Sequence, residues 1–169
     1  MKHTITLLPL CAGMLMLAIP AGAQTSAPIV VTLSSGLACN GQSQPQFAAQ
    51  SINSSVDYPD PLFSSTQRGP SFPDISLTKQ FDACSISLYQ MIFFGTRVPS
   101  AVISFFASQN GPEVIRVTLT GAWVTSVADS DSKQAGHAET VTLSYEKIDI
   151  LDLLTNTHTS YDRTSGTAH

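Results

Sequence analysis

The strongest constraint on the fold is the alternation of apolar and polar residues along several short segments. In Val141–Tyr145 and Ile75–Phe81 every second residue points to the same face, and Lys79 is the one polar member of that set. A period of two is typical of half-buried strands. Val114–Val127 is a longer run of the same kind, with Gly121 marking a bulge or bend. These runs favour a sandwich or barrel over a helical bundle.

Further strands and the connections between them follow from β-branched runs and from Pro, Gly and Asn. Asn110-Gly111 predicts a tight hairpin turn. The apolar phase slips near Lys147, after which Ile148 and Ile150 occupy the apolar face. The remaining strands are expected at Ile29–Leu33, Phe47–Val56, Ala101–Ala107 and Thr159–Asp162, with loops at 38–46, 57–73 and 128–138.

One short helix is expected after the strand that ends at Phe81. Asp82 or Ser85 can cap its first turn by accepting from free backbone N–H groups. The apolar residues of Ile86–Phe93 are expected to share one broad face, and Gly95 is placed to end the helix in a left-handed turn. The fold class that follows is mainly β: a barrel of two antiparallel sheets flanked by one short α-helix.

The N-terminus has the pattern of a secretory signal peptide. Lys2 precedes an apolar run, Ile5–Ile19, which is shorter than the roughly 20 residues that a membrane-spanning helix needs. Ala21-Gly22-Ala23 offers the small residues that a signal peptidase requires, so cleavage is expected between Ala23 and Gln24. The chain would then consist of a signal peptide, 1–23, and a single domain, 24–169. The mature protein is expected in the periplasm or outside the cell, with no membrane segment after signal removal.

Two cysteines, Cys39 and Cys84, remain after that cleavage. In an oxidising compartment a disulfide is the default expectation, and two separate buried thiols are the alternative. Closing a loop of this length would stabilise the fold by about 4 kcal/mol in the chain-entropy model. No histidine lies near either cysteine, so the pair makes a poor metal site.

Composition and motifs argue against several functional classes. The net charge is −4 and the 8 basic residues are scattered, which argues against a nucleic-acid partner. His137, His158 and His169 lie in polar or terminal segments, and no serine lies in a nucleophile-elbow motif. Asp129–Lys133 starts like a calcium loop, but Lys133 occupies a ligand position. His137–Glu139 lacks the cysteine motif of zinc deaminases. We therefore expect no catalytic, cofactor-binding or metal-binding residues and a structural or binding protein.

Residues 72–150 resemble a known family. The most specific pieces are Lys79-x-x-Asp82-x-x-Ser85-x-x-Leu88 and the strand Glu139-x-Val-x-Leu-x-Tyr-x-Lys-Ile148. Around them stand Phe72, Gly95, Pro99–Ile103, Ile115–Thr120 and Trp123–Val127. In this order the segments resemble the Hcp family, the haemolysin-coregulated tube proteins of type VI secretion. Residues 29–56 are more loosely similar to the first two strands of that family.

The resemblance implies a non-enzymatic protein whose barrels join side by side into a hexameric ring. Such rings stack into an expelled tube that can carry small effectors or contact a spike protein, and the segment 57–73 would contact the next ring. Tube subunits of the family normally lack a cleavable signal and load from the cytoplasm. Because this chain has a signal-peptide pattern, the alternative is an exported barrel of the same lineage that acts as a periplasmic or extracellular binding or adhesive module.

Overall fold

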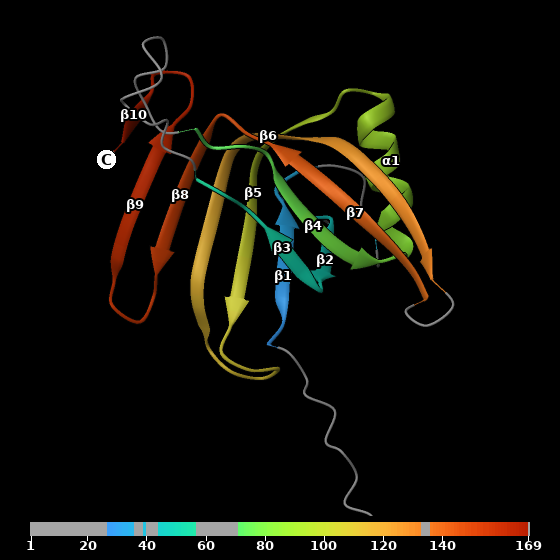
Figure 1. Cartoon of the computed structure of the whole chain (residues 1–169), viewed down its shortest axis with the longest axis horizontal. Helices are drawn as coiled ribbons and strands as arrows, with labels where there is room; N and C mark the ends of the chain where they lie inside the picture. Colours follow the sequence, from blue (N-terminus) through green and yellow to red (C-terminus); the bar gives the residue numbers. More distant parts are fainter. Residues whose placement is uncertain (1–26, 36–38, 40–43, 57–70, 133–135, 169) are drawn as a thin grey trace, which may run out of the picture.

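The computed structural model describes residues 27–35, 39, 44–56, 71–132 and 136–168 (Figure 1). The expected signal peptide, its cleavage point between Ala23 and Gln24, and positions 57–70 of the expected loop lie outside the described residues. The elements are β1 (Ile29–Leu33), β2 (Gln46–Ala49), β3 (Ser51–Asn53), β4 (Ile75–Gln80), α1 (Ala83–Phe93), β5 (Arg97–Phe106), β6 (Glu113–Ser132), β7 (Gly136–Ser144), β8 (Lys147–Asp152), β9 (Thr157–Asp162) and β10 (Thr167–Ala168).

The strands wrap into a barrel, as the sequence predicts, and the chain itself joins the two sides where β2 leads into β3. One side is the antiparallel series β2–β1–β5–β6, and the other is β3–β4–β7, which joins β6 again. The expected strand Phe47–Val56 is wrong in one respect, because it is divided at Gln50 into β2 and β3. The chain crosses there from one side of the barrel to the other, and the Gln50 N–H donates to the Thr78 carbonyl at 2.7 Å.

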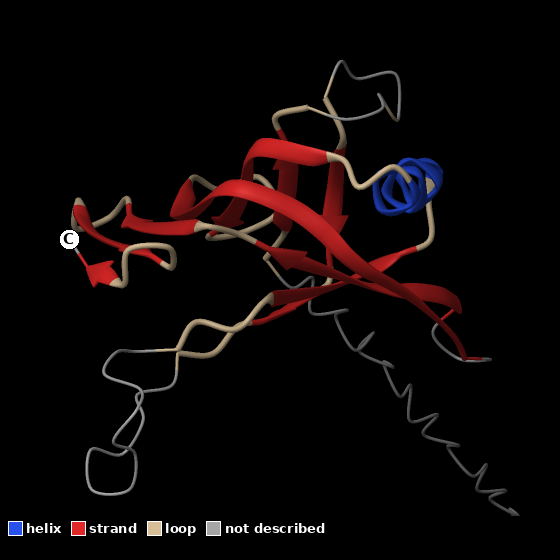
Figure 2. Cartoon of the chain, turned by 90° about the horizontal axis from the view of Figure 1, so that it is seen from above, coloured by secondary structure: helices blue, strands red, loops and turns tan. Residues whose placement is uncertain are grey.

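Three further strands, β8, β9 and β10, extend the sheet beyond the barrel from the edge of β6. We call Lys147–Ala168 the wing. Figures 1 and 2 show the wing on one flank of the molecule and α1 on the opposite flank. The short final strand β10 was not expected from the sequence, since two residues of pairing leave no periodic signal.

Gly121 lies where β6 changes its neighbour. On one edge β6 pairs with β8 over Ile115–Thr120 and with β7 from Trp123 onward. Between them Gly121 has a φ of +59°, a conformation that residues with a Cβ adopt only at a cost. The side chains of Arg97 and Glu146 occupy the space that a Cβ would need. The predicted bend therefore serves to pass β6 from the wing to the second side of the barrel.

The expected polar loop at 128–138 is wrong. β6 continues to Ser132 and β7 begins at Gly136, so most of the segment is a hairpin with pairs such as Asp129↔Glu139 and Ser130↔Ala138. A backbone ladder needs no apolar side chains when a strand lies at the surface. Asp129, Ser130 and His137 are exposed, so their polarity indicates exposure and not the absence of a strand.

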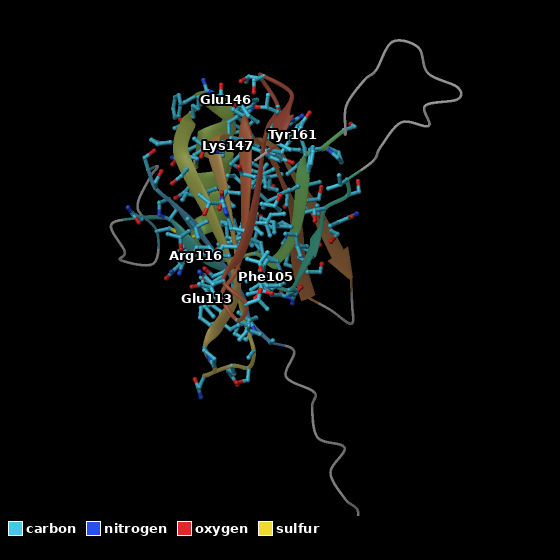
Figure 3. All side chains as sticks on the ribbon, turned by 90° about the vertical axis from the view of Figure 1, so that its left-hand side faces the viewer. Phe105, Glu113, Arg116, Glu146, Lys147 and Tyr161 are labelled. Carbon is cyan, nitrogen blue, oxygen red and sulfur yellow. A yellow bond between two sulfur atoms is a disulfide. The ribbon has the colours of Figure 1, made fainter. Side chains whose placement is uncertain are left out.

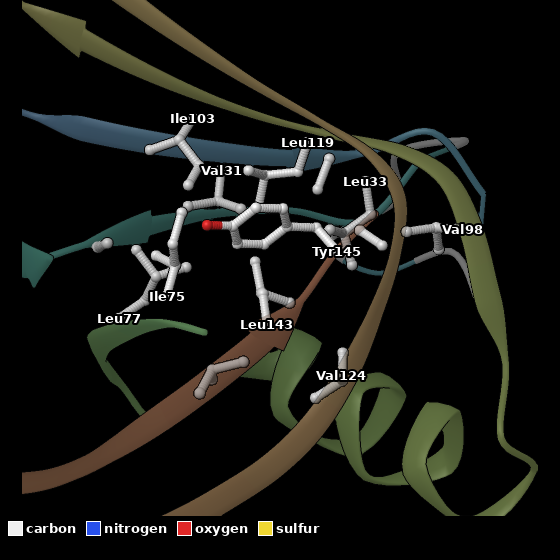
Figure 4. Packing of buried hydrophobic residues seen from close by; sticks show 14 of the residues in the cluster. Val31, Leu33, Ile75, Leu77, Val98, Ile103, Leu119, Val124, Leu143 and Tyr145 are labelled. Carbon is white, nitrogen blue, oxygen red and sulfur yellow. The ribbon is translucent and has the colours of Figure 1, made fainter. Parts of the chain in front are cut away.

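The core lies between the two sides of the barrel. In Figure 4 the ring of Tyr145 lies among Leu33, Leu119 and Leu143, and all three leucines have no exposed surface. The Tyr145 hydroxyl leaves this cluster and donates to the Pro73 carbonyl at 3.2 Å. Burial raises the pKa of Tyr145, although the nearby Arg163 opposes the shift. The aromatic ring thus fills the core while its polar end stays hydrogen-bonded.

A buried ion pair connects the barrel to α1. Lys79 on β4 and Glu139 on β7 are direct cross-strand partners, and neither side chain is exposed. The Lys79 Nζ lies 2.7 Å from Glu139 Oε1 and 2.9 Å from Asp82 Oδ1. The Ser85 hydroxyl donates to the same Glu139 oxygen at 2.7 Å. The polar interruption of the β4 pattern is therefore the point at which the helix is attached.

The ends of α1 follow the capping signals in the sequence. Asp82 is the N-cap and accepts from the Cys84 N–H, while the Ser85 side chain accepts from the Asp82 N–H. Asp82 and Ser85 thus cap the helix together. At the other end Phe94 is the C-cap and Gly95 follows with a φ of +59°, as expected for a left-handed turn.

Cys39 and Cys84 form a disulfide in the structure, with their Cα atoms 5.0 Å apart. Both cysteines are buried, with exposed fractions of 5% and 0%. The bond joins the chain that follows β1 to the first turn of α1. It therefore holds the same end of the helix as the ion pair does.

Replacing Gly121 with Ala is expected to lower the free energy of unfolding by about 1–2 kcal/mol, because an L-residue is strained at this φ. Displacing the exposed Arg97–Glu146 pair adds at most about 1 kcal/mol. Gly95→Ala is the matched control. Its φ is the same but no atom lies within 4 Å of the added Cβ, so it shows the cost of the backbone strain without the displaced ion pair. Urea denaturation measures both. A Gly121→Ala variant as stable as the wild type would contradict the bend in β6.

Replacing Lys79 with Met is expected to lower the free energy of unfolding by about 3–5 kcal/mol, because Glu139 is then a buried charge without its cation. The double variant Lys79→Met/Glu139→Leu removes both charges and is expected to recover a large part of that loss. Guanidinium denaturation of the single and double variants checks the pair. Losses that simply add in the double variant would show that the two side chains do not interact.

Reduction of the Cys39–Cys84 bond is expected to lower the melting temperature, since closure of the intervening loop contributes about 4 kcal/mol. The control is the variant Cys39→Ala/Cys84→Ala, whose melting temperature should be low with or without reductant. Differential scanning calorimetry compares the four samples. Equal melting of the wild type with and without reductant, together with two titratable thiols in both samples, would show that the native protein lacks the bond.

Candidate functional site

The outward side of α1 is an exposed apolar surface. We define the outer face of α1 as Ile86, Tyr89, Gln90 and Phe93, which recur at helical spacing. Ile86 is 56% exposed and Phe93 is 77% exposed. The Tyr89 and Phe93 rings lie with their centroids 6.4 Å apart. Large apolar side chains gathered on one exposed face are typical of an interaction surface.

The expectation that the apolar residues of Ile86–Phe93 share one broad face is wrong, because Leu88 and Met91 are buried whereas Ile86 and Phe93 are exposed. The inward side of the helix consists of Cys84, Ser85, Ser87, Leu88 and Met91. Two serines are buried while Ile86 and Phe93 face outward. The signal that could have revealed this was the absence of any charged residue from Ala83 to Phe93. A helix that has no charged residue lacks the polar stripe that normally marks its solvent-facing side.

The one ionisable group on the outer face stays neutral. The Tyr89 hydroxyl donates to Asp129 Oδ1 on β6 at 2.8 Å. This hydrogen bond raises the pKa of Tyr89 to about 12. The phenol keeps its proton at physiological pH, so the four residues of the outer face carry no charge, and the Asp129 carboxylate on β6 lies beside them.

A shallow depression of about 320 Å³ lies past the C-terminal end of α1 and is lined by Gly95, Arg97, Trp123 and Glu146. Arg97 forms an ion pair with Glu146, and its guanidinium carbon lies 5.5 Å from the centre of the Trp123 ring. Phe94, next to Gly95 in the chain, is 78% exposed. At this end of the helix, the exposed aromatic side chains therefore lie beside the Arg97–Glu146 ion pair of the barrel.

The wing presents a second apolar feature. A groove of about 80 Å³ is lined by Phe72, Ile148, Ile150, Thr159, Ser160, Tyr161 and Ala168. Phe72 precedes β4 and stacks on Tyr161, with ring centroids 4.2 Å apart. None of the lining side chains is charged. We call this site the wing groove.

The outer edge of the wing is only partly paired. β10 pairs with β9 at Tyr161 and Asp162, whereas β9 begins at Thr157. Within the part of the chain that the structure describes, the edge over residues 157–160 has no neighbouring strand. An unpaired strand edge offers backbone donors and acceptors to another chain.

The two ends of the barrel differ from these flanks. Figure 3 places Glu146, Lys147 and Tyr161 at one end of the molecule. Glu113 and Arg116 lie toward the opposite end and form an ion pair through two hydrogen bonds, which lowers the pKa of Glu113. Both ends therefore carry paired charges, whereas the outer face of α1 and the wing groove are uncharged.

The residues tested for chemistry in the sequence do not converge. His137 on β7 lies edge-on to the Phe81 ring. His158 lies on another strand, β9, with its Nε2 3.5 Å from Asp149 Oδ2 on β8. His169 lies outside the described residues. Asp129 is engaged by Tyr89. Over the described ranges, no three His, Cys, Asp or Glu side chains gather in a way that could hold a metal ion.

A search for membrane spans within the described residues found no helix with the length and hydropathy needed to cross a bilayer.

Comparison with known proteins identifies the family. Residues 39–151 match the family model described as "Type VI secretion system effector, Hcp". No match was found among curated proteins.

Solved structures share the fold along nearly their whole length. Hcp1 from Salmonella typhimurium is similar with a TM-score of 0.70 and 17% identity, covering 85% of this chain and 99% of that one. Hcp1 from E. coli has a TM-score of 0.69 at 19% identity, covering 81% and 99%. The secreted protein Hcp3 from Pseudomonas aeruginosa has a TM-score of 0.64 at 20% identity, covering 81% and 98%. The chain belongs to the Hcp family of type VI secretion proteins.

Proposed function

We propose that the protein is a ring-forming subunit whose rings stack into a tube that is expelled with small effectors in its lumen or with a spike protein at its tip. The main observation that supports this proposal is the family match over residues 39–151. Hcp-family proteins are structural, not enzymatic, form hexameric rings and are secreted by the type VI system. The fold agrees with this role, since solved Hcp structures are matched over 98% or more of their length.

The surface of the subunit supports assembly. The outer face of α1 exposes Ile86 and Phe93, which a solitary subunit would leave in water. Burying such side chains stabilises by roughly 25 cal/mol per Å² of apolar area. No charged side chain of the outer face would have to be desolvated, which agrees with the depletion of charge at interface cores.

The ends of the barrel are suited to a different contact. Glu146 and Lys147 at one end, and Glu113 and Arg116 at the other, offer polar groups to the barrel above or below (Figure 3). Phe72, the second described residue after positions 57–70, stacks on Tyr161 at the first of these ends. This agrees with a role for the segment 57–73 in contacting the next ring.

We infer that residues 1–23 are a signal peptide removed between Ala23 and Gln24, and that 24–169 form the barrel domain. Support comes from the apolar run ended by Pro20 and from Ala21-Gly22-Ala23. The buried Cys39–Cys84 bond adds an independent argument, because disulfides persist in exported proteins and are rare in the cytosol.

The same disulfide favours a second candidate function. An exported Hcp-like barrel could act as a periplasmic or extracellular binding or adhesive module instead of loading into a tube from the cytoplasm. Genes for a sheath, baseplate and spike beside this one would favour the tube. Their absence would favour the module.

For protein recovered from the periplasm of an expression host, we expect a molar mass of six subunits in multi-angle light scattering at micromolar concentration. Intact mass spectrometry of the same sample is expected to show a chain that begins at Gln24 and carries the disulfide. Ring closure by one repeated contact is the physical reason for a single discrete mass.

The possible results separate the proposals. A mass of one subunit would overturn the ring, whereas the exported module would remain. An exported chain that keeps residues 1–23 would overturn the cleavage site. Protein found only in the cytoplasm with two free thiols would overturn export.

A further inference from the structure

We propose that the outer face of α1 of one subunit docks on the wing of the next copy of this chain, with Phe93 directed to the wing groove. This inference rests on the proposed ring, and it names the two surfaces that would form each contact. Phe93 is 77% exposed, and the groove between Phe72, β8 and β9 holds about 80 Å³, room for part of one apolar side chain.

The first step is the composition of α1. Its inward side packs Leu88 and Met91 into the core, yet its outward side carries Ile86 and Phe93. Large apolar side chains left exposed on one face of a helix are typical of an interaction surface. In the single subunit only one side of α1 is covered, so the outer face requires a partner to complete its burial.

The second step is the acceptor. The wing groove is lined by apolar side chains of Phe72, Ile148, Ile150 and Tyr161 on two strands and the segment before β4. Next to it, residues 157–160 form a strand edge with no neighbour in the described part of the chain. An apolar recess beside an open edge is a combination that a second chain can cover.

The third step is the placement of the two surfaces. α1 lies on one flank of the barrel and the wing lies on the opposite flank in both views (Figures 1 and 2). A ring with one subunit type needs two different patches on each copy, because its contact is head to tail. Helix-to-helix contact would instead use the same patch twice and stop at a dimer.

The fourth step is charge. The outer face of α1 has no charged side chain, and the lining of the wing groove has none either. Tyr89 is neutral at physiological pH, and its hydrogen bond to Asp129 raises its pKa further. The pairing therefore buries no charged side chain of either surface, and the one neighbouring carboxylate, Asp129, already accepts a hydrogen bond from Tyr89. The charged ends of the barrel lack this property.

Cross-linking tests the contact directly. The double variant Gln90→Cys/Thr159→Cys places one thiol on the outer face and one at the wing groove, while Phe93 is kept. With a short bismaleimide on the oxidised, exported protein, we expect a ladder of linked subunits that ends at the ring size. Each single-cysteine variant serves as a control and is expected to give no ladder, because its thiols do not face each other. Cys39 and Cys84 are buried in their disulfide and do not react.

A charge on the outer face provides the second measurement. Phe93→Asp is expected to lower the light-scattering mass to that of one subunit without lowering the melting temperature, since Phe93 is largely exposed. Gln109→Asp, in the exposed turn between β5 and β6, is the matched control and is expected to keep the ring mass.

The outcomes distinguish this inference from the proposal on which it rests. A wild-type ring that persists in Phe93→Asp, with no ladder from the double variant, would overturn the docking surfaces and leave the ring intact. A strong dimer from Gln90→Cys alone would show helix-to-helix contact and also overturn the inference. A wild type with the mass of one subunit would overturn the ring and this contact with it.

Discussion

The buried pair of Lys79 and Glu139 decides which side of α1 faces the barrel. Because the helix has apolar residues on both sides, hydrophobic burial alone would not distinguish Leu88 and Met91 from Ile86 and Phe93. Ser85 resolves this ambiguity, since its hydroxyl donates to Glu139 and accepts from the Asp82 N–H. Turning the helix would take the Ser85 hydroxyl away from a buried carboxylate oxygen. The loss of a buried hydrogen bond to a charged group is costly, so the observed rotation of the helix is preferred. The exposed aromatic surface is thus a consequence of a polar contact on the opposite side.

The disulfide strengthens the same end of the helix. Cys84 follows the N-cap and is joined to Cys39, so the first turn of α1 is held by a cap, an ion pair and a covalent bond. The other end has no such attachment among the described contacts. There Phe93 and Phe94 are exposed beside the depression at Arg97 and Trp123. The helix is fixed where it meets the core and presents aromatic rings where it leaves the core.

The sequence predicted the features that local chemistry controls. Alternation identified β4 and β7, Asp82 and Ser85 identified the helix start, and Gly121 identified the bend in β6. Features set by tertiary contacts were missed. In the hairpin of β6 and β7, Asp129, Ser130 and His137 are polar because they are exposed. β2 separates from β3 because the chain crosses the barrel at Gln50. Ile86 and Phe93 were grouped wrongly with Leu88 and Met91, because a stretch with no charged residue gives no indication of which apolar residues are buried.

Export and assembly do not compete for the same part of this subunit. The Cys39–Cys84 bond lies on the inward side of α1 and is buried, whereas Ile86 and Phe93 lie on the outward side. Oxidation restricts the unfolded chain and so stabilises the folded subunit, but it changes no atom of the outer face. An exported subunit therefore keeps the apolar surface that a ring would cover. The difference between a tube protein and an exported module of this family then depends on which partner reaches that surface, and not on a change in the barrel itself.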